Sequence, residues 1–284
     1  MEATRSEITA FIAEAVRGLY PEREARRIAL TAAAALSGES EAKFLADPNQ
    51  RVNIDGVEHC AAQLAAGCPV QYVTGKAEFC DMTFHVDESV LIPRPETEEL
   101  VLWAEQCAAA RTHPRILDLC TGSGCIAIVL AAHLPQAEVT ALDISHAAIE
   151  TARRNAAMNG VRIRFIEDDV LNGIASLAGE TFDIIVSNPP YIPHSEIASM
   201  HINVTRYEPH EALFVDDADP LVFYRVIARA ARTMLSEGGP LLFEVHEAWA
   251  ERTAEMLRGE GFGQTEVRND LFGKPRMICS LRRR

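Results

Sequence analysis

The stretch SNPPYI, residues 187–192, places a short amide and two prolines directly after the apolar run FDIIV. Pro189 and Pro190 form a stiff loop because their φ angles are fixed, and they donate no backbone hydrogen bond, so the loop carbonyls stay available as acceptors. The side-chain oxygen of Asn188 and the carbonyl of Pro189 can together hold one planar NH2 group. Tyr191 can lie against the flat face of that group. The loop therefore predicts a site that orients an amide or aryl amine.

A second segment, DLCTGSGCIA at residues 118–127, looks like a loop that opens a helix. Gly122 and Gly124 permit a tight turn and let a ligand approach the amides at the helix N-terminus. Asp143 comes 19 residues after Gly124, where a carboxylate can accept hydrogen bonds from ribose hydroxyls. These features predict a nucleoside-bearing cofactor. The same spacing also fits an NAD(P)-binding loop or a purely structural glycine turn.

The loop at Asn188 distinguishes between these cofactors. Hydride transfer has no evident need for a stiff pair of carbonyl acceptors. Methyl transfer from S-adenosylmethionine (SAM) to a weakly nucleophilic NH2 group does need one, because it depends on alignment and on stabilising the positive charge that develops. We therefore predict SAM as the cofactor and Asn188, Pro189, Pro190 and Tyr191 as the catalytic residues. Taken by itself, the loop has one alternative, an Asn-Pro turn that only ends a strand.

The elements that must position these residues alternate regularly from residue 96 onward. Strand-like runs such as RILDL, EVTALD and FDIIV are separated by helical runs such as CIAIVLAAHL and HAAIETARRNAAMNG. This order predicts an α/β fold with a mostly parallel sheet, helices on both faces and a terminal antiparallel pair. The two loops would then meet at the carboxyl edge of the sheet, where such folds bind ligands.

The first third of the chain has a different pattern of apolar residues and does not show this alternation. Residues 1–70 carry apolar positions at helical spacing and predict a small all-α domain. Residues 71–95 contain the β-rich pieces QYVTG, MTFHV and SVLI, which predict a β-hairpin connector. The remaining residues, 96–284, form the predicted sheet domain.

Charge and composition argue against several classes of protein. A net charge of −14 over 284 residues disfavours a long phosphate-binding surface, so we expect no direct nucleic-acid binding. The nine histidines show no HxH or HExxH spacing, so we expect no metal site. No apolar run reaches the roughly 18 residues of a membrane span, and the seven cysteines include no CxxC pair. We expect a cytoplasmic protein with free thiols and no membrane association.

Together these motifs resemble a known family. NPPY after the fourth strand resembles the amino methyltransferases that act on NH2 groups. The run QYVTGKAEFCDMTFHVDESVLIPRPETEELV, with VSNPPYIP, RYEPHEALF and NDLFGKPRMI, is similar to the HemK/PrmC family, the peptide chain release factor glutamine N5-methyltransferases. The likeness covers essentially the whole chain. It implies a class I SAM-dependent methyltransferase (Rossmann-like) domain that methylates the glutamine of the GGQ motif in release factors, with the helical domain docking this partner.

The resemblance also implies roles for single residues. Asn188, Pro189, Pro190 and Tyr191 would hold the glutamine. Arg94 and Glu96 are substrate-binding candidates in the stretch 91–98 that borders the pocket, although Arg94 also fits a surface linker and Glu96 a helix N-terminal acid. The implied cofactor contacts are Cys120, Thr121, Gly122, Ser123, Gly124, Asp143, Asp169, Val170 and Asn188.

The sequence departs from the family pattern at the cofactor loop and elsewhere. Cys120 stands where the family usually has glycine, and Val170 stands where it often has an aromatic that stacks on adenine. The run EVHEAW, residues 244–249, lacks the usual Gly-x-x-Gln pattern. Two rival functions stay open: a nucleic-acid amino methyltransferase acting on N6 of adenine or N2 of guanine, and a non-catalytic SAM-binding module.

Overall fold

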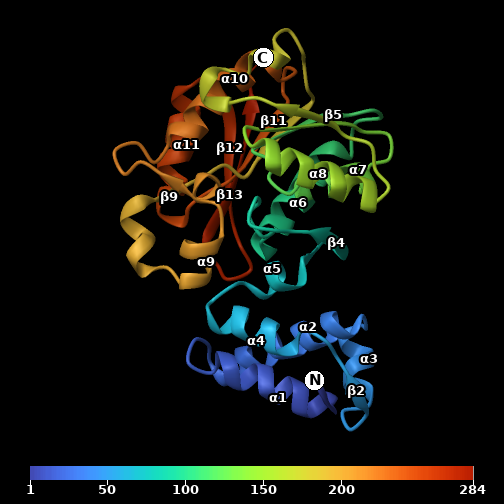
Figure 1. Ribbon diagram of the computed structural model, residues 1–284. Helices are drawn as coiled ribbons and strands as arrows, with labels where there is room; N and C mark the ends of the chain where they lie inside the picture. The colour runs from blue at the N-terminus through green and yellow to red at the C-terminus, as the bar shows by residue number, and fades with distance from the viewer. Residues whose placement is uncertain (284) are drawn as a thin grey trace. The chain divides into compact units, whose positions relative to one another are not determined.

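Residues 1–283 are described by a computed structural model (Figure 1). Contacts divide these residues into two compact units. The first unit joins Met1–Lys76 to Met200–Tyr207, and the second joins Ala77–Ser199 to residues 208–283. No helix within residues 1–283 is long and apolar enough to cross a membrane.

Short helices around a small apolar core make up most of the first unit. Thr4 begins the first helix with a capping box, in which its hydroxyl accepts from the Glu7 amide and the Glu7 carboxylate accepts from the Thr4 amide. Ile8, Ile12 and Phe44 are buried in the core. The elements are α1 (Arg5–Val16), α2 (Glu22–Ser37), α3 (Glu41–Ala46), α4 (Val57–Ala65), α5 (Val70–Thr74), α9 (Ile202–Tyr207) and the antiparallel strands β1 (Glu2–Thr4) and β2 (Arg51–Asn53).

Two pieces of the predicted β-rich connector are not strands, and those predictions are wrong. The run QYVT lies in helix α5, which follows Pro69 and ends at Gly75 with a φ of 68°. The Thr74 hydroxyl donates to the Val70 carbonyl at 2.9 Å. A proline with preset φ at one end and a left-handed glycine at the other favour a short helix despite the β-branched composition. The run SVLI forms no strand either.

One segment of the first unit comes from the far half of the sequence. The Tyr207 hydroxyl, at the end of α9, donates to the Ala66 carbonyl at 3.0 Å. A Cβ built on Gly67 would lie 3.0 Å from the Ile202 side chain, and Gly67 has a φ of 90°. Glycine therefore permits this close approach. The contact units thus interleave along the chain, whereas the predicted division uses three consecutive blocks.

A seven-stranded sheet forms the centre of the second unit (Figure 1). Its strand order is β12-β13-β11-β8-β5-β6-β7, and neighbours from β11 to β7 pair in parallel. Strand β13 runs antiparallel to both β11 and β12. The predicted sheet with a terminal antiparallel pair is confirmed. The strands are β5 (Arg115–Leu119), β6 (Glu138–Asp143), β7 (Arg164–Glu167), β8 (Ile184–Ser187), β11 (Pro240–Glu244), β12 (Phe262–Asn269) and β13 (Pro275–Arg282).

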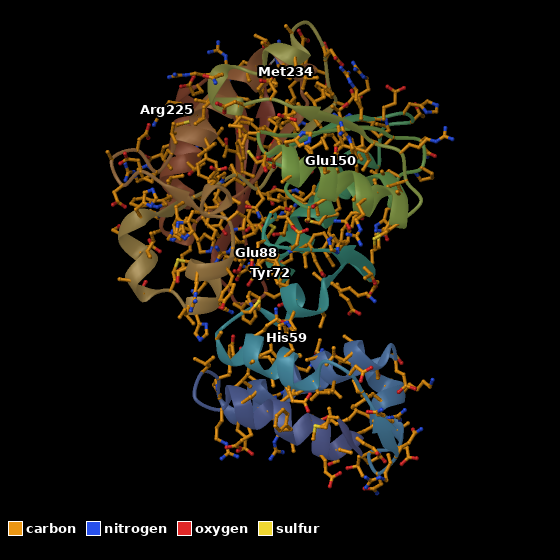
Figure 2. The ribbon with its side chains drawn as sticks, viewed as in Figure 1. His59, Tyr72, Glu88, Glu150, Arg225 and Met234 are labelled. Carbon is orange, nitrogen blue, oxygen red and sulfur yellow. The ribbon has the colours of Figure 1, made fainter. Side chains whose placement is uncertain are left out.

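Alternate strand residues contribute to two apolar cores, one on each face of the sheet. Leu117 and Leu119 belong to the core that includes α10 and α11, whereas Ile116 belongs to the core that includes α6 and α7. Figure 2 shows Arg225 and Met234 near opposite ends of α10, and Met234 is buried in the first of these cores. The sheet is therefore covered on both faces. The helices are α6 (Pro95–Ala108), α7 (Cys125–His133), α8 (His146–Met158), α10 (Val222–Met234) and α11 (Ala250–Gly259), and the remaining strand pairs are β3 (Lys76–Phe79) with β4 (Met82–His85) and β9 (Ile192–Pro193) with β10 (Phe214–Val215).

Candidate active site

The register of four parallel strands brings polar residues together at one edge of the sheet. Leu119 of β5 pairs with Leu142 of β6 on one side and with Ser187 of β8 on the other. Ser187 in turn pairs with Phe243 of β11. The chain order reverses at β5, so this edge is the switch point at which open α/β sheets bind ligands. The residues that follow this row on their strands are Asp143, Cys120, Asn188 and Glu244.

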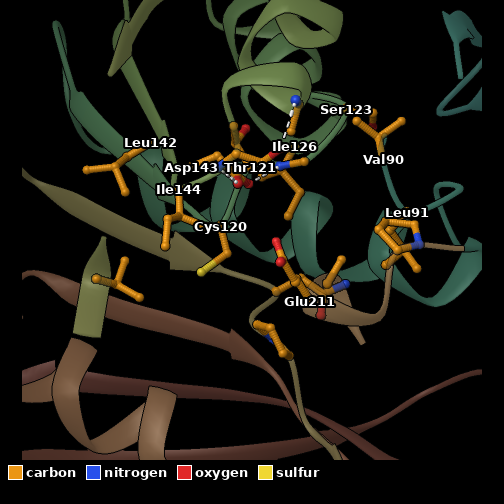
Figure 3. Close-up of a pocket in the computed structure, with 18 of the residues that line it drawn as sticks. Val90, Leu91, Cys120, Thr121, Ser123, Ile126, Leu142, Asp143, Ile144 and Glu211 are labelled. Atoms are coloured by element: carbon orange, nitrogen blue, oxygen red, sulfur yellow. Dashed lines mark hydrogen bonds between the residues drawn. The ribbon is translucent and has the colours of Figure 1, made fainter. Parts of the chain in front are cut away.

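A cavity of about 380 Å³ lies at this edge (Figure 3). Small-molecule sites usually have volumes of about 300–1,000 Å³. Figure 3 shows Leu142 and Ile144 on the side of the cavity opposite Val90 and Leu91. Several residues predicted to be functional from the sequence lie outside its lining: Glu96, Gly124, Pro189 and Tyr191. Those that line it are Arg94, Cys120, Thr121, Gly122, Ser123, Asp143, Asp169, Val170, Asn188 and Pro190.

The loop after β5 turns through left-handed backbone at Cys120, with a φ of 60°, and at Gly122, with a φ of 54°. Apart from its chain neighbours, no described residue lies within 4 Å of a Cβ built on Gly122, so that face of the loop is open to a ligand. A Cβ on Gly124 would lie 3.0 Å from the side chains of Ala152 and Ile128. Gly124 therefore permits close packing of α7, which explains why it does not line the cavity.

Asp143 fastens the cofactor loop to the end of β6. Its carboxylate accepts a hydrogen bond from the Gly122 amide at 2.8 Å and another from the Ser145 amide at 3.0 Å. Burial raises the pKa of this carboxyl group above its usual range. A carboxylate has about four lone-pair sites, so Asp143 can still accept from a ligand in the cavity. This capacity, beside the open backbone at Gly122, fits the ribose of a nucleoside-bearing cofactor.

Asp118 is a second buried carboxyl group beneath the same loop. It is fully buried and accepts a hydrogen bond from the Thr121 hydroxyl at 2.6 Å. Burial raises the pKa of Asp118 to about 7, because the charged form loses its hydration. Asp118 does not line the cavity. It stabilises the loop through its hydrogen bond with the Thr121 hydroxyl. Within the described residues, no cluster of three or more His, Cys, Asp or Glu side chains is placed to hold a metal ion.

Apolar side chains form the wall of the cavity beyond Asp143. Val170 is buried in this wall, and the partly exposed Ile144 and Leu171 lie there too. Phe223 of α10 also lines the cavity. The sequence analysis does not identify this phenylalanine, because it follows Val170 by more than fifty residues and no local motif marks it. The wall supplies the apolar surface that a flat base requires even though residue 170 is not aromatic.

Two residues of the NPPY loop, Asn188 and Pro190, line the cavity, and the other two, Pro189 and Tyr191, do not. The Asn188 Nδ2 donates to Thr97 Oγ1 at 3.3 Å. The Tyr191 hydroxyl donates to Glu244 Oε1 at 3.0 Å. Burial raises the pKa of Tyr191, so this hydroxyl stays protonated and serves as a donor. The Tyr191 ring also meets the His246 ring edge-on, with ring centroids 6.0 Å apart.

Glu244 was not expected from the sequence to belong to the site. It ends β11, its side chain is 1% exposed, and it accepts from Thr97 Oγ1 at 2.6 Å as well as from Tyr191. Its backbone carbonyl accepts from the Tyr224 hydroxyl at 3.2 Å. Burial raises the pKa of Glu244 despite these hydrogen bonds. The position of a glutamate at the end of an apolar strand is the one sequence signal that points to it.

Arg94 forms an ion pair with the buried carboxylate of Glu208. Its Nη2 donates to Glu208 Oε1 at 2.5 Å, and the other oxygen of Glu208 accepts from the Ile92 amide at 3.2 Å. Arg94 lines the cavity, whereas Glu96 lies in the first turn of α6. The position of Glu96 is that of the helix N-terminal acid, the second of its two sequence interpretations.

The sequence of this chain is similar to those of known methyltransferases. Residues 102–206 match the model of the family described as "Methyltransferase small domain". Proteins named "Release factor glutamine methyltransferase" are similar over much longer stretches. The one from Bacteroides thetaiotaomicron is 38% identical over 283 residues, which is 97% of this chain and 99% of that protein. The one from Flavobacterium psychrophilum is 46% identical over 219 residues, 76% of each chain.

Solved structures are similar at the level of the fold. The hMettl16 catalytic domain, solved with an RNA hairpin from the MAT2A 3'UTR, has a TM-score of 0.56 at 16% identity and covers 79% of this chain and 81% of its own. A methyltransferase from Pyrococcus furiosus has a TM-score of 0.50 at 16% identity, with coverage of 72% and 91%. These neighbours support the predicted class I methyltransferase fold.

Proposed function

Because this chain belongs to the release factor glutamine methyltransferase family, we propose that it methylates the glutamine of the GGQ motif in peptide chain release factors. The methyl group comes from SAM and the acceptor is the side-chain amide nitrogen N5. One observation carries the proposal. Asn188 lines the cavity at the end of β8, next to the strand whose loop carries Gly122.

The residues around the cavity fit SAM. Residues 120–123 and Asp143 would hold the ribose and the methionine part of SAM, with Gly124 shaping the same loop from outside the cavity lining. Asp169 and Val170 would lie beside the adenine base. Asp169 already accepts hydrogen bonds from the Leu171 amide and the Asn172 side chain, each at 2.8 Å, so its orientation is set before a ligand arrives. The bound cofactor supplies a methyl group on a positively charged sulfur, which is an electrophile.

The protein's own contribution is to hold the acceptor nitrogen. The Asn188 side-chain oxygen and the Pro189 carbonyl would each accept one hydrogen bond from the glutamine NH2 group. These acceptors fix the plane of the amide and stabilise the positive charge that grows on its nitrogen during transfer. Pro190, which lines the cavity, keeps the loop stiff. The Tyr191 ring would pack against the glutamine and exclude water.

Partner recognition completes the proposal. We assign release factor docking to the helical domain at residues 1–70, with residues 71–95 as connector and 96–284 as the methyltransferase domain. Arg94 and Glu96, close to the start of α6, would meet the inserted loop. The net charge of −14 supports a protein partner over direct nucleic-acid binding. We also propose a cytoplasmic location, supported by a sequence whose seven cysteines include no CxxC pair.

Incubation with labelled SAM and purified release factors tests this function. Mass spectrometry of the peptide that contains the GGQ motif should find one added methyl group on the glutamine side chain. A release factor with alanine in place of that glutamine is the control and should take up no label. Label on another residue, or label on nucleic acid but not on the release factor, would contradict the proposal.

A further inference from the structure

A buried chain of hydrogen bonds runs from Glu244 through Thr97 to the Asn188 side chain. Thr97 lies in the first turn of α6 and is 2% exposed. Its Oγ1 is 2.6 Å from Glu244 Oε2 and 3.3 Å from Asn188 Nδ2. The other oxygen of Glu244 receives the Tyr191 hydroxyl. Glu244 therefore contacts both ends of the NPPY loop, directly at Tyr191 and through Thr97 at Asn188.

The chemistry of these groups fixes the direction of each hydrogen bond. The Thr97 hydroxyl donates its one hydrogen to Glu244 Oε2, and the Tyr191 hydroxyl donates to Oε1, so both oxygens of Glu244 accept. The Thr97 oxygen is then left as an acceptor. Its neighbour in the Asn188 amide must be the nitrogen, because the amide oxygen has no hydrogen to offer. The side-chain oxygen of Asn188 consequently turns away from Thr97 and stays available to accept from a substrate.

Without this chain, either orientation of the Asn188 amide would be possible. An isolated primary amide can rotate by half a turn at little cost, which exchanges its oxygen and nitrogen. If the side-chain nitrogen of Asn188 faced the substrate glutamine, Asn188 would present a hydrogen-bond donor to the NH2 group that it must hold. Two donors facing each other repel and leave the substrate amide unaligned.

Stability alone does not account for a carboxylate at this position. Burial raises the pKa of Glu244 even though it receives two hydroxyl hydrogen bonds and lies near Arg276. The direction of this shift means that the ionised group is less well solvated in the protein than in water. A well-packed apolar side chain would avoid this cost, so the carboxylate has to be explained by what it orients.

We propose that Thr97 and Glu244 are positioning residues for methyl transfer, which hold the Asn188 side-chain oxygen toward the acceptor nitrogen. The proposal rests on the proposed function, because it assigns Asn188 the task of accepting from the glutamine amide. Glu244 also holds the Tyr191 hydroxyl, so one carboxylate orients two residues of the loop. Neither Thr97 nor Glu244 touches the reacting atoms in this assignment.

Three substitutions separate an orienting role from a packing role. Thr97→Val keeps the size of the side chain and removes the hydroxyl, so kcat for methyl transfer to a purified release factor should fall about 10- to 100-fold. Thr97→Ser retains the hydroxyl and should restore kcat to within about threefold of the wild type. Glu244→Gln replaces an obligate acceptor with a group that can also donate, and should lower kcat about tenfold or more. KM for SAM should change less than about threefold in each.

Thr253→Val is the matched control. Thr253 is a fully buried threonine in α11 whose hydroxyl donates to the Trp249 carbonyl at 2.9 Å. Removing this hydroxyl takes away a buried hydrogen bond far along the chain from the NPPY loop, and kcat should stay at the wild-type value. Thermal unfolding of all variants shows whether Thr97→Val has lost its fold, in which case Thr97→Ser and Glu244→Gln decide the question.

A double substitution gives the sharpest test. If Thr97 acts through Asn188, then Thr97→Val should have no further effect on kcat once Asn188 is alanine. Effects of Thr97→Val and Asn188→Ala that multiply would overturn the proposal, as would a Thr97→Val enzyme with wild-type kcat. A wild-type protein that does not methylate release factors contradicts the proposed function itself and this inference with it, so the two failures are distinct.

Discussion

Arg94 and Glu208 form an ion pair at 2.5 Å although 114 residues separate them in the sequence. Glu208 is almost fully buried, and it also accepts from the Ile92 amide at 3.2 Å. The pair ties the loop that precedes α6 to the residues that follow α9. Both Arg94 and Pro209, the neighbour of Glu208, line the cavity. The ion pair therefore sets the position of two separate parts of the cavity wall.

Glu208→Gln should lower the free energy of unfolding by about 2 kcal/mol, because a buried charged acceptor is replaced by a neutral one. Denaturant unfolding measures this difference. Glu150→Gln is the control, since Glu150 pairs with Arg153 on the surface with both side chains about half exposed. An exposed pair of this kind contributes less than about 1 kcal/mol. Equal losses in the two variants would show that the Arg94–Glu208 pair is no stronger than a surface pair.

Asn188→Ala should reduce kcat for release factor methylation about 100- to 1,000-fold, the usual effect of removing one transition-state contact. The substitution removes a partly exposed side chain whose partner is the Thr97 hydroxyl, so thermal unfolding should change little. Asn269→Ala, at the exposed end of β12, is the control and should keep full activity. An unimpaired rate in Asn188→Ala would reject its assigned role.

The raised pKa of Asp118 should make the free energy of unfolding depend on pH, and an asparagine at this position should remove that dependence. Its pKa is about 7 in the folded protein, against an ordinary value of 3.8. Between these values the folded state keeps a proton that the unfolded state has lost, so this group's contribution to stability falls as pH rises and is gone above about pH 7. The substitution Asp118→Asn keeps a side-chain oxygen that can accept the hydrogen bond from the Thr121 hydroxyl, while it removes the titrating group.

The measurement for Asp118 is the difference in free energy of unfolding between Asp118→Asn and the wild type at pH 5 and at pH 8. The variant should gain about 3 kcal/mol relative to the wild type over this interval, since one pKa unit corresponds to about 1.4 kcal/mol. Carboxylates with lowered pKa values, such as Asp270, act in the opposite direction, but they are common to both proteins and cancel. Parallel pH profiles would show that Asp118 titrates normally.

Cys120 holds a backbone conformation that side chains disfavour. Its φ is 60°, in the left-handed region that favours glycine. The strain of a non-glycine residue in this region is about 1–2 kcal/mol. The free energy of unfolding of Cys120→Gly should therefore exceed that of Cys120→Ala by about 1 kcal/mol. In denaturant unfolding, Cys120→Gly should unfold at the higher denaturant concentration. Both variants lose the thiol, so the comparison isolates the backbone. Equal stability would mean that the loop relaxes without strain.

Local patterns were enough to predict the sheet and its two loops. The residues that form the NPPY turn and the glycine loop are consecutive in the sequence. The spacing of apolar residues that is typical of strands and helices can likewise be recognised within short segments. The same reasoning was wrong for QYVT, where helix-end residues outweighed β-branched composition. It also left Glu96 with two roles, of which its place in the first turn of α6 matches the helix N-terminal acid.

By itself, the sequence determined the α/β order and the carboxyl-edge placement of Asn188 and Asp143, because these depend on neighbours along the chain. Only the tertiary structure decided that Thr97 accepts a hydrogen bond from the Asn188 side chain and donates one to Glu244. Those contacts span 91 and 147 residues and follow from strand register and helix packing. No local period records them, since a hydrogen bond between distant segments depends on how the whole sheet is assembled.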